Sequence, residues 1–324
     1  MRDLPPVNLS IIIVNWNSKD YVRQCLESIA RHRPAANFEV IVADNASFDG
    51  CDKMLESAFP AAVFLQAGKN LGFAGANNLG ARHAKGPNLL FLNPDTEFLG
   101  NSIDPLLQRL AALPNAGAVG CKLLHPDRSL QTSCVQSFPT VINQALDSEF
   151  LRRRFPRSPL WGMAALHSDE ITPSEVEAIS GAAILIKRDV FVAVGGFSES
   201  YFMYGEDLDL CFKVRRAGYR VYHVPETSIV HYGGGSTKTS AGNFSNVMMR
   251  ESVHRFLRAH RGVLSASLYR ATMAATALLR MALILPLLLV RRNGVVQRGK
   301  TALRKWTAIL RWSCGLESWV NTRE

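Results

Sequence analysis

The feature that most constrains the fold is an alternation of short apolar runs with amphipathic helix patterns over residues 9–92. The first run, Leu9–Val14, is dominated by β-branched residues, which is typical of a strand buried on both faces of a parallel sheet. Ser18 is placed to cap the helix that follows. The alternation predicts a Rossmann-like, doubly wound α/β sheet. The expected order is strand Leu9–Val14, helix Lys19–Arg31, strand Phe38–Val42, helix Cys51–Ala58, strand Val63–Leu65, helix Gly72–Ala84 and strand Leu89–Leu92.

The second half continues this pattern after an interruption. Residues 125–176 contain proline, serine and the basic run Arg152-Arg153-Arg154, and predict a long, partly mobile excursion that could meet an acceptor. Gly218 stands where a helix C-cap belongs. The expected elements are a strand at Ala178–Lys187, a helix at Arg188–Val194, an aromatic loop at Tyr201–Gly205, a helix from Glu206 to Arg216, and strands at Tyr219–Val224 and Ile229–His231.

Polar residues stand directly after the predicted strands. They are Asn15, Asp44 and the segment Asn93-Pro94-Asp95. In doubly wound sheets ligands bind beyond the carboxyl ends of the strands, so these positions predict one site. A second acidic group, Glu206-Asp207-Leu208-Asp209, opens a helix pattern. Three carboxylates in four residues repel one another unless a helix N-terminus, a metal ion or a substrate hydroxyl offsets the charge.

Charge divides the chain near residue 245. Residues 248–324 carry a net charge of +11, whereas residues 1–247 carry −1. We therefore expect one domain at residues 1–245 and a helical, basic C-terminal region at 246–324. The six cysteines have no CxxC spacing, which favours reduced core residues in a cytosolic protein. The apolar run near the N-terminus is far shorter than a signal peptide requires, so a cytoplasmic location is expected.

Seven short motifs follow one another over residues 8–240: SIIIVNWN at 10–17, VADNAS at 42–47, NLGFAGANN at 70–78, FLNPDT at 91–96, GGF at 195–197, GEDLD at 205–209 and HYGGGS at 231–236. In this order they resemble the inverting, nucleotide-sugar-dependent family 2 glycosyltransferases, which have a GT-A fold. Bacterial rhamnosyltransferases of surface-polysaccharide assembly are the most similar branch. Each motif alone is weak evidence, and the ordered set is strong.

The resemblance implies that Asp207 is the catalytic base, with Glu206 and Asp209 orienting it or holding acceptor hydroxyls. Inverting transfer needs a base for the acceptor hydroxyl while a nucleoside diphosphate leaves from the opposite face of the sugar. The simpler alternative is a helix N-terminus that carries acidic residues without chemistry.

The resemblance also implies a divalent cation, Mg²⁺ or Mn²⁺, held by Asp95 and completed by His231. The family usually presents Asp-X-Asp here, whereas this chain has Asn93-Pro94-Asp95, so weaker metal affinity is expected. A lone histidine at a strand end is otherwise more often structural.

A pyrimidine nucleotide is expected at the first site, because the Asp44 carboxylate can accept the imide N–H of uracil or thymine. An Asx-turn is the alternative role for Asp44. The Gly-rich opening of the helix at Gly72 would let backbone N–H groups face phosphate. Gly233–Ser236, with Lys238, could form a lid over the diphosphate or a plain linker. The predicted nucleotide-sugar-binding residues are Asn15, Asn17, Asp44, Asn45, Ser47, Asn70, Gly72, Gly75, Asn77, Asn93 and Asp95.

The C-terminal region suggests membrane contact. Residues 271–290 form an apolar run broken by Arg280 and Pro286, so a full bilayer span is doubtful. Val295–Trp312 has helical spacing of apolar residues, with Trp306 and Trp312 among basic ones, and suits a helix in an anionic membrane interface. Packing of the apolar run as a helical hairpin on the protein or against a second subunit stays open. No nucleic-acid-binding motif is present, so nucleic acid is not an expected partner.

The sequence therefore predicts an inverting glycosyltransferase at the cytoplasmic face of the inner membrane, peripheral or weakly inserted through its C-terminal region. The expected donor is dTDP-L-rhamnose and the expected acceptor a lipid-linked oligosaccharide. A UDP-sugar-dependent enzyme of the same family and a nucleotide-sugar-binding protein with weak or lost catalysis are the alternatives. A nucleotidyltransferase is disfavoured, because the first loop lacks a triphosphate-binding Gly/Lys-rich motif.

Overall fold

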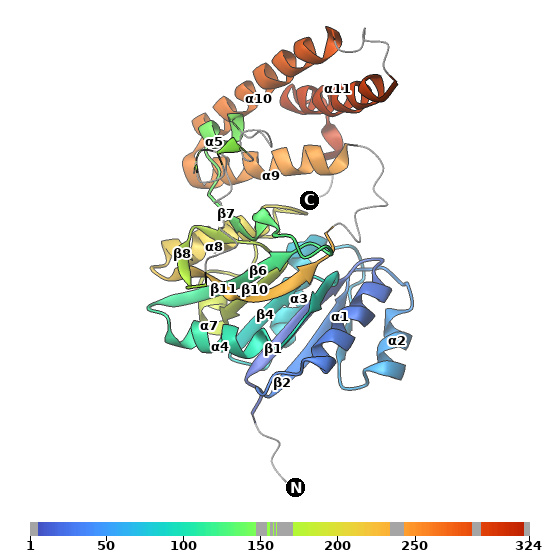
Figure 1. The fold of residues 1–324 in the computed structure, drawn as a ribbon, viewed down its shortest axis with the longest axis vertical. Coiled ribbons are helices and arrows are strands. Elements are labelled where there is room, and N and C mark those ends of the chain that lie inside the picture. The colour runs from blue at the N-terminus through green and yellow to red at the C-terminus, as the bar shows by residue number, and fades with distance from the viewer. Residues whose placement is uncertain are drawn as a thin grey trace. The chain divides into compact units, whose positions relative to one another are not determined.

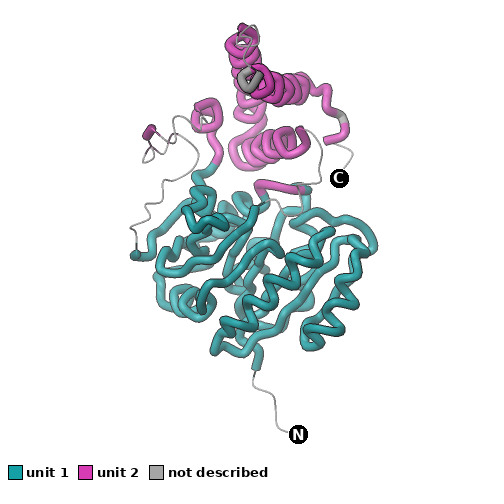
Figure 2. The backbone as a smooth tube through the Cα atoms, turned by 45° about the vertical axis from the view of Figure 1, so that its right-hand side comes forward, with its two compact units in different colours: residues 1–138, 163–202, 206–238 teal, residues 139–162, 203–205, 239–324 magenta. Residues whose placement is uncertain are grey.

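The computed structural model describes residues 6–146, 154–155, 158, 160, 171–233, 243–286 and 293–320. The chain divides into two compact units. The first comprises residues 1–138, 163–202 and 206–238, and the second residues 139–162, 203–205 and 239–324 (Figure 2). The second unit thus includes three segments that the sequence analysis had assigned to residues 1–245, namely 139–162, 203–205 and 239–245. One of them contains α5 (Val141–Ala145), which contacts a C-terminal helix. The predicted domain boundary at 245/246 stays a prediction.

A nine-stranded sheet forms the centre of the first unit (Figure 1). Its strand order is β3-β2-β1-β4-β10-β6-β11-β5, and β8 pairs with β11. The strands β3, β2, β1 and β4 are parallel, β10 runs antiparallel to β4 and β6, and β11 is parallel to β6. The predicted mostly parallel α/β sheet is confirmed. The strands are β1 (Leu9–Asn15), β2 (Phe38–Asp44), β3 (Val63–Gln66), β4 (Asn88–Leu92), β5 (Thr96–Phe98), β6 (Ala116–Leu124), β8 (Ser174–Val176), β10 (Ala183–Lys187) and β11 (Arg220–His231).

Helices cover both faces of this sheet. Every residue of β1 is buried, as its β-branched composition predicts. On one face, Ile11 and Ile13 belong to a core shared with α1, α2 and α4. On the other face, Ile12 touches Gly80 of α3, and Phe91 packs against Phe191 and Phe197. The helices are α1 (Lys19–Arg31), α2 (Cys51–Ala58), α3 (Gly72–His83), α4 (Ile103–Ala112), α7 (Arg188–Ala193) and α8 (Glu206–Arg216).

The predicted strand Ala178–Lys187 is wrong as a single element. It is divided into β9 (Ala178–Ile179) and β10, with a turn at residues 180–182 between them. β9 pairs instead with β7 (Val135–Gln136), which follows the short 3₁₀ helix η1 (Thr132–Cys134). In this turn the backbone N–H of Gly181 donates to the side chain of Asp207. The basic run at 152–153 and residues 234–238 of the predicted lid lie outside the described residues.

Three long helices dominate the second unit: α9 (Phe244–Arg261), α10 (Val263–Ile284) and α11 (Asn293–Ser313), followed by η4 (Ser318–Val320). Glu251 of α9 is buried among them, where it accepts hydrogen bonds from Trp312 Nε1 (2.9 Å) and Arg255 Nε (3.0 Å). Trp312 and Trp306 are 1% and 8% exposed. The expectation that these tryptophans lie in a membrane interface is therefore wrong, because the apolar face of α11 packs into its own unit.

The outer face of α10 has the opposite character. Leu264, Leu268, Leu279 and Leu283 are between 54% and 83% exposed, whereas Tyr269 on the inner face is fully buried. Throughout the described parts of the chain, the helices lack the combination of length and apolar character that a bilayer span requires.

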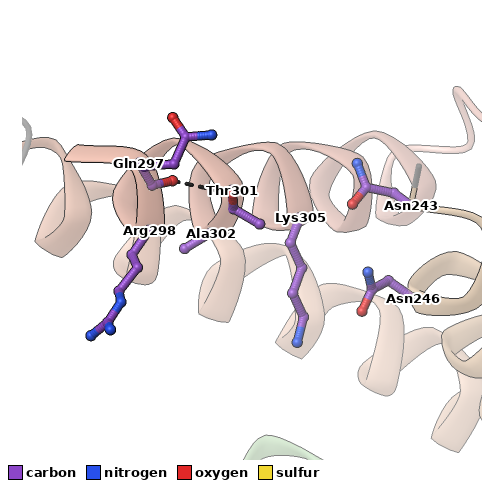
Figure 3. Close-up of a pocket in the computed structure, with 7 residues that line it drawn as sticks. All are labelled: Asn243, Asn246, Gln297, Arg298, Thr301, Ala302 and Lys305. Atoms are coloured by element: carbon purple, nitrogen blue, oxygen red, sulfur yellow. Dashed lines mark hydrogen bonds between the residues drawn. The ribbon is translucent and has the colours of Figure 1, made fainter. Parts of the chain in front are cut away.

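A cavity of about 470 Å³, to which polar and basic residues contribute most of the lining, lies between the start of α9 and α11. Figure 3 shows Arg298 and Lys305 projecting to the same side of α11, with Asn246 of α9 beside them. No carboxylate belongs to the lining, which consists of Asn243, Asn246, Gln297, Arg298, Thr301, Ala302 and Lys305.

All six cysteines are free thiols. Five are buried, and Cys314 after α11 is exposed. Burial raises the pKa of Cys25, Cys121 and Cys211 to about 12, which keeps these thiols protonated and unreactive. The predicted reduced core cysteines are confirmed at these positions.

Candidate active site

Four strand ends bring the predicted donor-site residues to one edge of the sheet. β1, β2, β4 and β11 run in the same direction (Figure 1). Asn15, Asp44 and His231 are the last residues of β1, β2 and β11, and Asn93 follows β4. Asn15 and Asp44 are paired in register on adjacent strands. This edge is where ligands bind in such sheets.

Asn15 is completely buried and its amide is fully engaged. Its Nδ2 donates to Asp44 Oδ1 (2.6 Å) and to Asp49 Oδ1 (3.0 Å), and its Oδ1 accepts from the backbone N–H of Ser18 (3.1 Å). Asp49, which the sequence analysis missed, also accepts from the N–H of Lys19 at the start of α1. Asn15 therefore holds the Asp44 carboxylate in place through a buried hydrogen bond.

Asp44 is 1% exposed and both its oxygens accept hydrogen bonds. Oδ2 accepts from the N–H of Ser47 (2.9 Å), the Asx-turn contact considered from the sequence, and from Gln66 Nε2 (2.7 Å). Of these two partners, Gln66 is exposed. Asn17 is also exposed, and its N–H donates to Ser47 Oγ.

Asn45 and Asn70 hold the loop that precedes α3. Asn45 Nδ2 donates to Asn70 Oδ1 (2.8 Å), and Asn45 Oδ1 accepts from the N–H of Leu71 (2.7 Å). The N–H of Gly72 donates to Asn70 Oδ1 (2.9 Å). Two predicted binding residues thus shape the loop through their side chains.

The start of α3 is packed too closely for side chains. Gly72 has φ 71°, and a Cβ on it would lie 2.5 Å from the carbonyl oxygen of Phe202. A Cβ on Gly75 would lie 2.9 Å from Leu71 Cβ, and Asn77 Nδ2 donates to the carbonyl of Phe73 within the helix. These contacts explain the glycines structurally, and their predicted contact with the nucleotide stays a prediction.

Asn93 and Asp95, which follow β4, lie close to His231 at the end of β11. His231 Nε2 lies 3.4 Å from Asp95 Oδ1 and 3.3 Å from Asn93 Nδ2. Its other ring nitrogen, Nδ1, lies 3.0 Å from Gln131 Oε1. Asp95 is 6% exposed, and the hydrogen bond from Thr96 Oγ1 to the carbonyl of Asn93 closes the turn.

A divalent cation fits this donor set. One carboxylate oxygen and one imidazole nitrogen face each other, and Mg²⁺ and Mn²⁺ are commonly held by one or two protein ligands together with substrate phosphates. Across the described residues, His, Cys, Asp and Glu form no group of three that could hold a metal by themselves. The remaining ligands would come from a bound substrate or the Asn93 amide oxygen.

Asp207 lies at the start of α8, held by the turn that interrupts the predicted strand. Its Oδ2 accepts from the N–H of Gly181 (2.9 Å), and its Oδ1 from the N–H of Leu208 (2.8 Å). Gln136 Nε2 lies 3.4 Å from Oδ2. Burial raises the pKa of Asp207, and these donors oppose that rise. The next carbonyl of the turn, that of Ala182, accepts from the N–H of Asn93 (2.9 Å), which links the two acidic segments.

Glu206 has a different environment. It is 7% exposed, and its Oε2 has no hydrogen-bond partner in the described parts of the chain. Burial, followed by the negative charge of Asp207, raises the pKa of Glu206 to about 8. At neutral pH this side chain is a neutral acid that can donate a hydrogen bond.

Asp209 points into the unit. It is 3% exposed, accepts from Ser198 Oγ (2.6 Å), and forms an ion pair with Lys213 (3.2 Å). Lys213 also donates to the carbonyl of Gly196 (2.6 Å). Asp209 thus anchors α8 to the loop before it, so the three acidic residues have three different environments.

Sequence reasoning missed three glutamines. Gln66 contacts Asp44, Gln131 contacts His231, and Gln136 contacts Asp207. None stands in a recognisable motif. What they share is visible only in the structure: the side-chain amide of each glutamine contacts a predicted functional side chain.

Comparisons with known proteins find two family models and several named relatives that match this chain. The model of the family described as glycosyl transferase family 2 matches residues 10–163, and that described as the N-terminal domain of galactosyltransferase matches residues 166–233. An N-acetylglucosaminyl-diphospho-decaprenol L-rhamnosyltransferase of Mycobacterium tuberculosis is 34% identical over 71% of this chain and 77% of its own. Rhamnosyltransferase WbbL of Escherichia coli is 27% identical over 68% of this chain and 82% of its own.

A solved structure supports the fold. A mannosyltransferase from Pyrobaculum calidifontis, in complex with GDP-Man and Mn²⁺, superposes with a TM-score of 0.58 at 17% identity. The match covers 98% of this chain and 90% of that one. The GT-A fold expected from the sequence is confirmed.

Proposed function

Because the chain belongs to glycosyl transferase family 2 and is a glycosyltransferase, we propose that it transfers L-rhamnose from dTDP-rhamnose to a hydroxyl of a lipid-linked glycan. The transfer inverts the configuration at the anomeric carbon of the sugar. The relatives named as rhamnosyltransferases, one of them acting on a decaprenol diphosphate, support the sugar and the acceptor class. A UDP-sugar donor is the alternative, since Asp44 would accept the same imide N–H from uracil and thymine.

The acceptor hydroxyl gives its proton to Asp207 as its oxygen attacks the anomeric carbon, and the bond from that carbon to the diphosphate oxygen breaks on the opposite face. The observation that carries this role is the geometry of Asp207: two backbone N–H groups fix the carboxylate of this half-buried residue. Glu206, as a neutral acid, can hold a second acceptor hydroxyl. Asp209 acts by positioning α8 through Lys213 and Ser198.

Asp95 and His231 would hold a divalent cation, Mg²⁺ or Mn²⁺, with the diphosphate of the donor. When bound, such an ion neutralises charge on the departing diphosphate. The residues of this chain contribute by orientation: Asn93 contacts His231, and the loop closed by Asn45 and Asn70 presents the start of α3 to the nucleotide.

Contact with the cytoplasmic face of the inner membrane would bring the enzyme to a lipid-linked acceptor. Support comes from the exposed leucines of α10, together with Arg298 and Lys305 in the cavity of the same unit (Figure 3). An apolar helix face and basic side chains on one unit suit an anionic bilayer surface. A second copy of the chain is the alternative partner for that face.

Transfer of labelled sugar to a lipid-diphosphate-linked N-acetylglucosamine tests the function, with dTDP-rhamnose compared against UDP- and GDP-sugars. We expect Asp207→Asn to reduce turnover by about 100-fold or more while dTDP-rhamnose binding is retained, because only the proton acceptor is lost. Asp189→Asn, an exposed acid in the first turn of α7, is the matched control and should leave turnover unchanged. EDTA should abolish turnover, and added Mg²⁺ or Mn²⁺ should restore it.

Near-normal transfer by Asp207→Asn would show that the acidic helix start is only structural. Full activity in EDTA would remove Asp95 and His231 from the metal role. Binding of dTDP-rhamnose without transfer to any acceptor would favour a nucleotide-sugar-binding protein.

A further inference from the structure

Gln131 is a buried glutamine whose amide orientation is fixed by its surroundings. It is 5% exposed and lies between the ends of β6 and β11. Its Nε2 donates to two backbone carbonyls, that of Leu124 (3.3 Å) and that of His231. A carbonyl accepts only, so the nitrogen of the amide must face these two groups. The oxygen, Oε1, is therefore the atom that faces the His231 ring.

This orientation determines which nitrogen of His231 carries the proton. Oε1 accepts only, and it lies 3.0 Å from Nδ1, so Nδ1 must be the N–H. The other nitrogen, Nε2, is then unprotonated in the neutral ring. One neighbour agrees, since Asn93 Nδ2 is placed to donate to it at 3.3 Å. The Asp95 carboxylate oxygen lies 3.4 Å from Nε2, so an unprotonated Nε2 and this oxygen are two neighbouring acceptors that a shared cation would satisfy.

We propose that Gln131 is a positioning residue of the cation site, which holds His231 in the tautomer whose Nε2 lone pair faces Asp95. This inference rests on the proposed metal role of Asp95 and His231. A histidine ligand whose second nitrogen donates to a fixed acceptor is oriented before the metal arrives, and loss of such an acceptor commonly weakens metal binding by about 10–100-fold. Gln131 also bonds the His231 main chain, so it fixes both the ring and the strand end.

Two substitutions separate the acceptor from the anchoring role. Gln131→Leu removes every polar contact at similar size. Gln131→Glu retains an oxygen for Nδ1–H but loses the two donors to the carbonyls. Ser102→Ala is the matched control, because Ser102 Oγ donates to the carbonyl of Ser228 on the same strand, β11, without touching His231.

The first measurement needs no metal. In ¹⁵N-imidazole NMR spectra of the full chain, the His231 signal, assigned with His231→Asn, should show a protonated Nδ1 and an unprotonated Nε2. Gln131→Leu should show a mixture of both tautomers. The second measurement is Mn²⁺ affinity in the presence of dTDP, from the free-Mn²⁺ electron paramagnetic resonance signal. Gln131→Leu should bind about 10–100-fold more weakly, whereas Gln131→Glu and Ser102→Ala stay within about threefold of the wild type.

An Nε2-protonated His231 in the wild type would overturn the proposal, as would a Gln131→Leu affinity within twofold of the wild type. Equal weakening by Gln131→Leu and Gln131→Glu would assign Gln131 to strand anchoring and overturn its role in the tautomer. Absence of Mn²⁺ binding by the wild type would instead overturn the metal site itself, on which the proposal rests. Near-UV circular dichroism of each variant establishes that it is folded.

Discussion

Glu206 and Asp207 are consecutive acidic residues at the start of α8, and their surroundings differ. Burial and the neighbouring charge raise the pKa of Glu206 to about 8, and its Oε2 has no partner in the described parts of the chain. Asp207 instead receives the N–H groups of Gly181 and Leu208, which favour its charged form. Hydrogen bonds therefore favour the charged form of Asp207 against the effect of burial, whereas Glu206 keeps its proton up to about pH 8.

Glu206→Gln should stabilise the protein at high pH. The pKa of Glu206 is higher in the folded state than in the unfolded chain, so the wild type loses stability as pH rises from about 4.5 toward 8. Glutamine does not titrate. The free energy of unfolding of the variant relative to the wild type should therefore increase by about 3 kcal/mol between pH 5 and pH 8, as measured by urea denaturation. A difference that does not change with pH would contradict the raised pKa.

Residues differ in how far the sequence reveals their roles. Asp207 and Glu206 could be predicted because a cluster of like charges in a helix start is conspicuous in the sequence. Gln136 and Gln131 could not, because they contact residues 71 and 100 positions away and glutamine has no distinctive pattern. Asn15 lies at the end of β1, as predicted, but its hydrogen bond to Asp49, 34 residues along the chain, could not be foreseen.

Among the elements, α3 depends on the conformation of its first residue. Gly72 combines φ 71° with a close approach to the carbonyl oxygen of Phe202. We expect Gly72→Ala to lower the free energy of unfolding by about 2 kcal/mol or more, since the new Cβ is strained and meets backbone. Gly100→Ala is the control, because nothing lies within 4 Å of its Cβ position, and it should change stability by about 0.5 kcal/mol or less. Equal effects in thermal unfolding would contradict the account.

The elements that the sequence failed to predict have a physical reason. β6 contains Gly117 and Gly120, which weaken a strand pattern. A Cβ on Gly117 would lie 2.8 Å from Tyr219 Cβ, and one on Gly120 would lie 2.9 Å from Ile179 Cβ. Close packing requires glycine at these two positions. Because glycine interrupts the apolar pattern, the strand could not be predicted from the sequence. For α11, an apolar face with tryptophans does not distinguish burial in protein from burial in lipid, and only the helices around Trp312 decide it.

At the scale of the whole molecule, charge and apolar surface are segregated. The basic excess of residues 248–324 falls within the second unit, and so does the exposed leucine face of α10. The first unit carries the residues proposed for transfer. The concentration of basic charge in residues 248–324 was predictable from composition. The inclusion of residues 139–162 and 203–205 in the second unit depends on long-range contacts.

The leucine face of α10 should control vesicle binding. We expect Leu264→Gln/Leu268→Gln to weaken binding to phosphatidylglycerol vesicles by about tenfold or more, because each leucine contributes about 1.5–3 kcal/mol when removed from water. The control, Val63→Gln/Val192→Gln, changes two exposed valines of the first unit and should leave binding unchanged. Co-sedimentation measures both. A wild-type dimer that the leucine variant dissociates, without vesicle binding, would assign the face to a second copy of the chain.

The distribution of thiols allows the second unit to be labelled selectively. Five cysteines are buried, and only Cys314 is exposed, directly after α11. A maleimide fluorophore or spin label added to the native protein should therefore attach at one position without any engineered cysteine. Its signal would report on the helical unit when vesicles or a lipid-linked acceptor are added, while the five remaining thiols would become reactive only as the protein unfolds.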